Sequence, residues 1–150
     1  MTPALEDLRD QGDEVDVDWI RESHPGILPI SDETVRELRA YVIERWEERA
    51  RERGEPRPSD LSSSCKFGSL FCKALLGGEI RGNFDHVHVF VEGRIVDLSE
   101  GAQDVAALAA PYRNDPDFLS DEDFAESLES CLPRVSAWVS AFLHERTPKP

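Results

Sequence analysis

A thiol, an imidazole and a carboxylate occur close together in this sequence, at Cys65, His86 and Asp97. A thiolate is a strong nucleophile, an imidazole can create it by taking the proton, and a carboxylate can hold the imidazole in the useful tautomer. Whether the three can act together depends on the elements that carry them.

The cysteine lies at the start of an expected helix. A serine run at 62–64 offers an N-cap directly before Cys65, and an apolar stripe then leads to the glycines at 77 and 78, which should end the helix. In the first turn of a helix over 65–76, unpaired backbone N–H groups and the macrodipole favour an anion. Cys72 lies two turns further along without comparable electrostatic help, so Cys65 is the candidate nucleophile.

The histidines belong to an expected β-hairpin. Residues 86–91 alternate strictly between polar or aromatic side chains and valines, which places His86 and His88 on one face of a strand. The dipeptide at 92–93, Glu-Gly, predicts a two-residue turn, and residues 94–98 should return as an antiparallel partner.

This hairpin brings an acid to the histidine face. If Val91 pairs with Arg94, then His88 lies opposite Asp97 and His86 is its diagonal neighbour. Diagonal pairs lie roughly 7–8 Å apart, within reach of side chains that lean toward each other. Asp97 could therefore orient either imidazole, while the alternative is a pair of polar residues on a solvent-facing surface.

A metal site is a second alternative, because His-x-His on a strand is a familiar ligand pair. Zinc cannot take both Cys65 and Cys72, since seven helical residues rise about 10 Å and two zinc-bound sulfurs lie less than about 5 Å apart. A site with both histidines and one further ligand stays open, and the third ligand would be Asp85, Asp97 or Cys65.

These segments resemble a known superfamily. The segment 64–71, SCKFGSLF, is similar to the helix-opening nucleophile segment of transglutaminase-like, papain-fold proteins. The segment 86–99, HVHVFVEGRIVDLS, is similar to their histidine strand, turn and aspartate strand, and the order Cys, His, Asp agrees as well. The resemblance covers roughly residues 62–103.

The resemblance implies a Cys-His-Asp triad in which Cys65 attacks an amide or ester carbonyl, His86 transfers the proton and Asp97 orients His86. His88 stands where the family usually has tryptophan, and we expect it to contact the substrate together with Ser64. No glutamine precedes Cys65, so backbone N–H groups at the helix start would stabilise the oxyanion. We expect hydrolysis of a peptide, protein or small amide or ester, as in a peptidase, amidase or deamidase, with no cofactor and no metal.

Composition restricts the partners and the location. The chain has 150 residues and a formal net charge of -14, which should repel nucleic acid. It has no apolar run as long as a signal peptide or a membrane span. Its three cysteines are few and odd in number, which argues against a disulfide framework. We therefore predict a cytoplasmic protein without membrane contact, in which Cys131 is a core residue. A catalytically inactive papain-like module that binds a basic partner through acidic surfaces at 1–22 and 100–129 is the remaining alternative.

The other elements complete an α+β domain over residues 1–150, with a catalytic core at 60–104. In the acidic segment 1–30 we predict a short helix after Thr2-Pro3 and then mostly irregular chain. Further expected elements are a helix from Ser31 to Gly54, a strand at 79–82, a helical stretch at 100–110, and a helix that starts at Ser120 and is split or kinked at Pro133.

Overall fold

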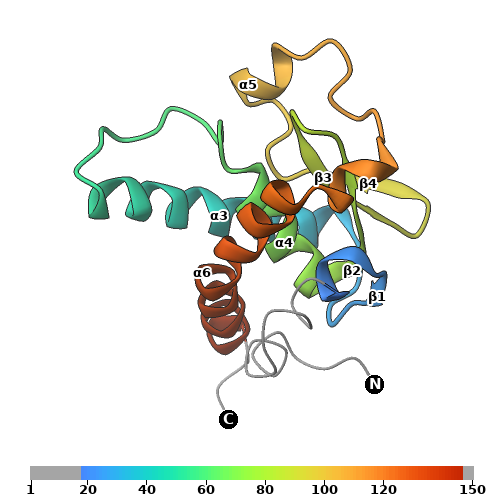
Figure 1. Ribbon diagram of the computed structural model, residues 1–150. Helices are drawn as coiled ribbons and strands as arrows, with labels where there is room; N and C mark the ends of the chain where they lie inside the picture. The colour runs from blue at the N-terminus through green and yellow to red at the C-terminus, as the bar shows by residue number, and fades with distance from the viewer. Residues whose placement is uncertain (1–17, 147–150) are drawn as a thin grey trace.

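The computed structural model describes residues 18–146, and the predicted helix after Thr2-Pro3 lies outside them. The chain forms helices and a four-stranded antiparallel sheet, with most strands consecutive in the sequence, which confirms the predicted α+β class (Figure 1). The elements are β1 (His24–Pro25), α3 (Asp32–Glu52), α4 (Cys65–Leu76), β2 (Gly77–Gly82), β3 (Val87–Val91), β4 (Arg94–Val96), α5 (Gln103–Ala106), the 3-10 helix η1 (Pro116–Ser120) and α6 (Glu122–Arg146).

The sheet has the order β1-β2-β3-β4, and the hairpin of β3 and β4 has the predicted register. Val91 pairs with Arg94, and Glu92 and Gly93 form the turn with φ of 49° and 78°. Two positive φ values in a two-residue turn match the right-handed twist of the strands. The strand β4 ends at Val96, so Asp97 lies one residue beyond the ladder.

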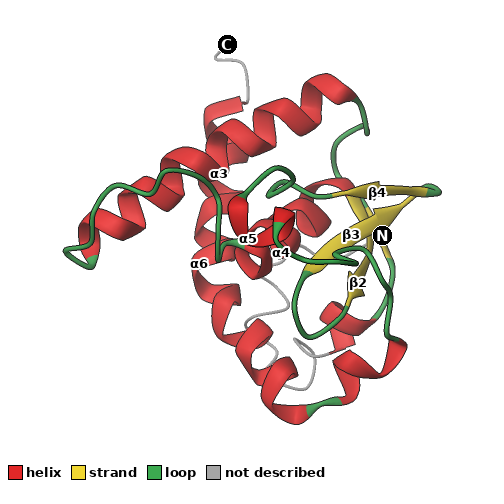
Figure 2. Cartoon of the chain, turned by 90° about the horizontal axis from the view of Figure 1, so that it is seen from above, coloured by secondary structure: helices red, strands yellow, loops and turns green. Residues whose placement is uncertain are grey.

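Helix α4 is the central element of the fold, because it packs against the sheet and against both long helices. Viewed from above, the strands lie on one side of the molecule and α3 and α6 on the other (Figure 2). Leu70, Phe71 and Leu75 of α4 are fully buried in this core together with the valines of β3. The Ser69 hydroxyl donates to the Val87 carbonyl (3.0 Å) and ties α4 directly to β3.

Helix α3 forms as the sequence predicts. The Ser31 side chain caps it by accepting from the Thr34 N–H (3.1 Å), and Leu38 and Val42 are completely buried. The chain turns at Gly54, whose φ of 66° suits glycine. The long loop that follows brings the chain from the end of α3 to Cys65 (Figure 1).

Helix α6 begins one residue later than predicted and is continuous at Pro133. Asp121, rather than Ser120, caps it by accepting from the Phe124 N–H (2.8 Å). The helix is also continuous through Pro133, so it is not split there. A buried stripe that includes Leu132 and Val135 continues on both sides of the proline, and this packing outweighs the local cost of proline. Within the described residues, no helix is long and apolar enough to cross a membrane.

The segment 100–110 is much less helical than predicted. Only α5 forms there, and only Ala102 and Val105 of this region are buried. The alanines that follow face solvent, so the segment offers the core too little apolar surface to extend the helix.

The N-terminal segment is more ordered than predicted over its described part. Residues 18–21 are helical and β1 follows them. Trp19 and Ile20 are buried in the main core, so this segment packs on the domain despite its acidic composition.

Candidate active site

His86 and Asp97 form a buried pair at the end of the sheet. The His86 Nε2 atom lies 2.7 Å from Asp97 Oδ2, and both side chains are about 98–99% buried. His86 immediately precedes β3, and Asp97 immediately follows β4. The predicted contact between the two residues is therefore present, and the diagonal neighbour His86, rather than His88, makes it.

Further donors hold the Asp97 carboxylate. The Ser99 N–H and hydroxyl donate to Oδ1 at 3.0 and 2.8 Å, and the Tyr112 hydroxyl donates to Oδ2 at 2.9 Å. Arg39 of α3 donates to the backbone carbonyls of Asp97 and Leu98 at 3.0 and 2.9 Å. Both the side chain and the backbone of Asp97 are thus fixed from several elements.

The pair is strongly polarised. Burial alone would lower the pKa of His86, but hydrogen bonds and charge interactions with Asp97 and Cys65 outweigh it and raise the pKa to about 9. Burial would likewise raise the pKa of Asp97, but its donors His86, Ser99 and Tyr112 lower it below the usual value. At neutral pH the site therefore holds an imidazolium next to a carboxylate.

Cys65 completes the candidate triad. It is partly exposed at the first position of α4, and its thiol interacts with His86 closely enough to help raise the pKa of the imidazole. Since Asp97 occupies Nε2 of His86, Nδ1 is the ring nitrogen left for the sulfur. The arrangement joins nucleophile, imidazole and carboxylate in the order that the chemistry of acyl transfer requires.

The start of α4 offers free backbone donors. The bond from the Gly68 N–H to the Ser64 carbonyl is the first of the helix, so the N–H groups of residues 65–67 precede the ladder. Ser64 is buried, and its hydroxyl donates to the Leu61 carbonyl (2.6 Å) instead of capping the described helix. Ser64 is thus engaged within the loop, and the N–H group of Cys65 has no hydrogen-bond partner among residues 18–146.

The backbone before the nucleophile is held in an unusual conformation. Ser63 has a φ of 71°, the left-handed region that residues other than glycine seldom adopt. The Asp104 carboxylate accepts from the Ser63 N–H (2.7 Å), and the Asp60 carboxylate accepts from the N–H groups of Ser62 and Gln103 (2.9 and 2.8 Å). These bonds tie the loop before α4 to the start of α5, and strain of this kind concentrates at functional sites.

His88 lies beside the pair but has a different character. Its ring is stacked 6.4 Å from that of His86, and burial lowers its pKa to about 4, with His86 and Arg81 adding to the effect and Asp97 opposing it. Its Nδ1 atom is buried and has no hydrogen-bond partner among the described residues. His88 is therefore a neutral wall of the site.

Three positioning residues were missed at the sequence level: Tyr112, Arg39 and Asn83. The Asn83 side chain accepts from the N–H groups of Asp85 and His86 (2.9 and 3.1 Å) and shapes the turn that presents His86. A Gly-Asn turn signal before the strand could have identified Asn83. Tyr112 and Arg39 reach the site only through tertiary packing, and no local pattern marks them.

The other two cysteines are core residues. Cys72 is completely buried, and its burial, with a smaller contribution from Asp97, raises the pKa of the thiol to about 12. Cys131 is also buried, as predicted, and burial raises its pKa as well. Cys65 is the one cysteine of the chain that solvent reaches appreciably.

A pocket of about 640 Å³ lies next to this network, and its lining comes from α3 and from the segments 57–61 and 98–102. Ser99, which donates to Asp97, is part of the lining, while the three candidate triad residues are not. In the described part of the chain, no three His, Cys, Asp or Glu side chains are placed to hold a metal ion.

Comparison with known proteins gives no relative from which roles could be transferred. No family model, curated protein or solved structure matches the chain. The roles of Cys65, His86 and Asp97 therefore rest on their geometry and chemistry.

Proposed function

We propose that this protein is a cysteine-dependent acyl-transfer enzyme on a papain- or transglutaminase-like core, and that it most readily hydrolyses amides. The observation that carries the proposal is the interaction of Cys65 with His86, whose Nε2 atom is held by the buried Asp97. The substrate would be a peptide, a protein or a small amide or ester.

The first half-reaction would form a thioester. The His86 imidazolium stabilises Cys65 as a thiolate, and the thiolate attacks the carbonyl carbon while the π electrons move to the oxygen. The tetrahedral intermediate collapses as the C–N bond breaks, and His86 gives its proton to the leaving amine. Asp97 keeps the His86 ring oriented in both protonation states.

The second half-reaction would regenerate the thiolate. A water molecule attacks the thioester while His86 takes its proton, and the C–S bond then breaks to release the carboxylic acid. The sum is amide plus water giving acid plus amine. The free N–H of Cys65 would donate to the oxyanion in both halves, with the macrodipole of α4 adding to the effect.

Selective alkylation tests the proposal. We expect iodoacetamide at pH 7 to label Cys65 at least about 100-fold faster than the two buried cysteines, because reaction needs both access and thiolate character. Mass spectrometry of digests would locate the label. The Cys65→Ala variant should lose the label and keep its melting temperature, while Cys72→Ala and Cys131→Ala serve as matched controls that keep the label.

The same experiment separates the rival functions. Label on Cys72 or Cys131 in place of Cys65 would overturn the assignment. A native Cys65 that reacts no faster than a free thiol peptide would favour a binding module, whose partner affinity should then weaken steeply with salt.

A further inference from the structure

We infer that Tyr112 is a positioning residue of this site, which shares one oxygen of Asp97 with His86 and thereby sets the strength of the His86–Asp97 pair. This inference deepens the proposed function and rests on it for its meaning in catalysis. It begins from a shared atom: both the Tyr112 hydroxyl (2.9 Å) and His86 Nε2 (2.7 Å) donate to Asp97 Oδ2.

The Tyr112 ring also fixes the imidazoles. Its edge meets the ring of His86 at a centroid distance of 6.0 Å and that of His88 at 5.2 Å, with interplanar angles of 65° and 89°. Such edge-to-face contacts restrict rotation of the imidazoles. The phenol therefore contacts the histidine through its ring and the carboxylate through its hydroxyl.

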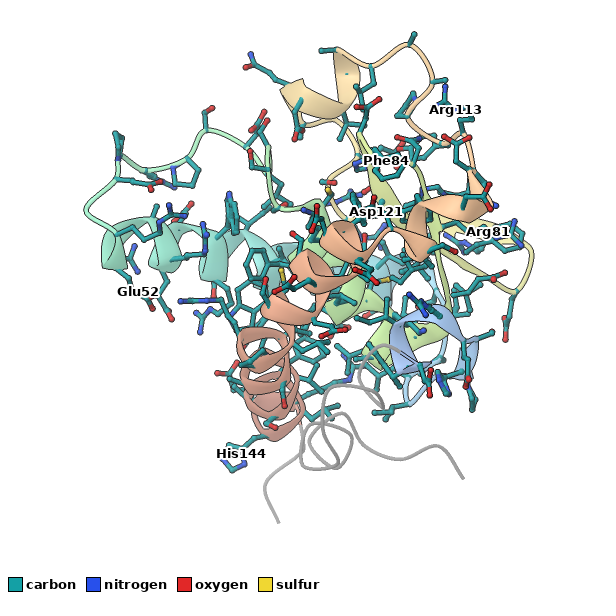
Figure 3. All side chains as sticks on the ribbon, in the orientation of Figure 1. Glu52, Arg81, Phe84, Arg113, Asp121 and His144 are labelled. Carbon is teal, nitrogen blue, oxygen red and sulfur yellow. The ribbon has the colours of Figure 1, made fainter. Side chains whose placement is uncertain are left out.

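The loop that carries Tyr112 is itself anchored. The Asn83 amide donates to the Arg113 carbonyl (2.9 Å), and the Gly82 N–H donates to Asn114 Oδ1 (3.2 Å). The N–H of Asp115 donates to the Gly82 carbonyl (2.8 Å). Figure 3 labels Arg113 on this loop and Phe84 on the turn before β3, the two segments that these bonds join.

The Asn83 side chain connects the turn that carries His86 to the loop that carries Tyr112. Its carbonyl oxygen holds the N–H of His86, and its amide holds the loop of Tyr112. A side chain whose backbone is fixed to the same turn as His86 can hold a constant distance to the pair. This linkage argues for a positioning role beyond simple burial of an aromatic ring.

The consequence concerns the proton on His86. An oxygen that accepts two hydrogen bonds attracts the imidazolium less than an oxygen that accepts one. Removal of the phenol hydroxyl should therefore strengthen the bond from His86 to Asp97 and make the imidazolium harder to deprotonate.

The test is a titration of His86 by NMR in the native protein, in Tyr112→Phe and in Tyr112→Leu. We expect the midpoint of His86 to rise by about 0.5–1 pH unit in Tyr112→Phe. In Tyr112→Leu, which also loses the ring, the imidazole should gain a second orientation and the resonance should broaden or double. Tyr41→Phe is the matched control, because Tyr41 is the only other tyrosine and packs against Phe71 and Phe142.

The alkylation profile gives a second measure. The rate of Cys65 labelling plotted against pH should have an inflection at the titration midpoint of His86. In Tyr112→Phe, this inflection should shift by the same amount as the midpoint. A lowered melting temperature with an unchanged His86 midpoint would reduce Tyr112 to a packing residue and overturn the inference. If Cys65 proves unreactive, the proposed function fails, yet the NMR midpoints still decide the role of Tyr112.

Discussion

Helix α4 has an ionisable side chain near each end, and the two side chains differ in burial and in hydrogen bonding. Cys65 opens the helix, and Lys73 lies in its last turn. A thiolate at the start of a helix and an ammonium near its end both interact favourably with the helix macrodipole. The thiol is partly exposed, whereas the lysine is 99% buried.

The difference lies in how completely each group is satisfied. The Lys73 ammonium donates to the carbonyls of Trp19, Ile20 and Glu22 and lies 4.7 Å from the centre of the Trp19 ring. These bonds hold the helical residues 18–21 against α4, and they use all three N–H donors of the ammonium, so none remains for a ligand. Around Cys65, by contrast, the helix cap is missing and a backbone donor is free. A buried ionisable group whose hydrogen bonds are all made stabilises the fold, whereas a site with an unused hydrogen-bond donor can bind and react with a substrate.

The largest effect should come from Lys73→Met, which keeps the length of the side chain and removes the ammonium. We expect a loss of about 2–3 kcal/mol of stability at pH 8, because the buried carbonyls around Lys73 lose the N–H donors of its side chain. Denaturant titration measures this loss. Labelling of Cys65 in the folded protein should stay within about twofold of the native rate, and a large drop would contradict the separation of the two ends.

The two ends should also respond oppositely to pH. Burial, partly offset by Glu79 and Glu22, lowers the pKa of Lys73 to about 7 in the folded protein. The unfolded chain therefore binds more protons between about pH 7 and 10.5, and Lys73 makes stability rise with pH over that range. Lys73→Met should remove this rise.

Asp97→Asn tests the other end and should have the next largest effect. The folded pKa of His86 lies above its unfolded value of 6.5, so the stability that the pair supplies is complete below pH 6.5 and is lost as pH rises through about 9. In Asp97→Asn this decline should vanish, and Cys65 labelling at pH 7 should fall about 10-fold or more because the imidazolium is lost. Asp115→Asn, which removes an exposed partner of Arg113, is the control.

If Asp97→Asn left both the decline and the labelling rate unchanged, His86 would not depend on Asp97. A fall in stability at all pH values with normal labelling would instead mark the pair as structural, as we conclude for Lys73.

The sequence was sufficient where the deciding contacts are local. Strand alternation and the turn at Glu92 predicted the hairpin, and the hairpin alone places Asp97 near His86. The structure departs from the prediction where packing on the core decides, as in the segment 100–110, where only α5 forms. Lys73 shows the same limit, since nothing in its own helix indicates that the carbonyls of a segment more than fifty residues earlier will cover it.

The smallest effect concerns the strained residue before the nucleophile. Ser63 and Glu92 are the two non-glycine residues with positive φ in the described chain, the first next to the candidate site and the second in the hairpin turn. Glycine at either position relieves strain, which should add about 0.5 kcal/mol of stability after the entropy cost of glycine. Thermal unfolding of Ser63→Gly and Glu92→Gly would measure this gain.

Of these two substitutions, only Ser63→Gly should change the labelling rate of Cys65. The Ser63 N–H is held by Asp104, and a freer backbone there should misplace the thiol part of the time. We expect Ser63→Gly to slow Cys65 labelling about two- to threefold and Glu92→Gly to leave it unchanged. Equal labelling in both variants would mean that the strain at Ser63 has no part in presenting the nucleophile, and that the loop merely tolerates it as the hairpin does.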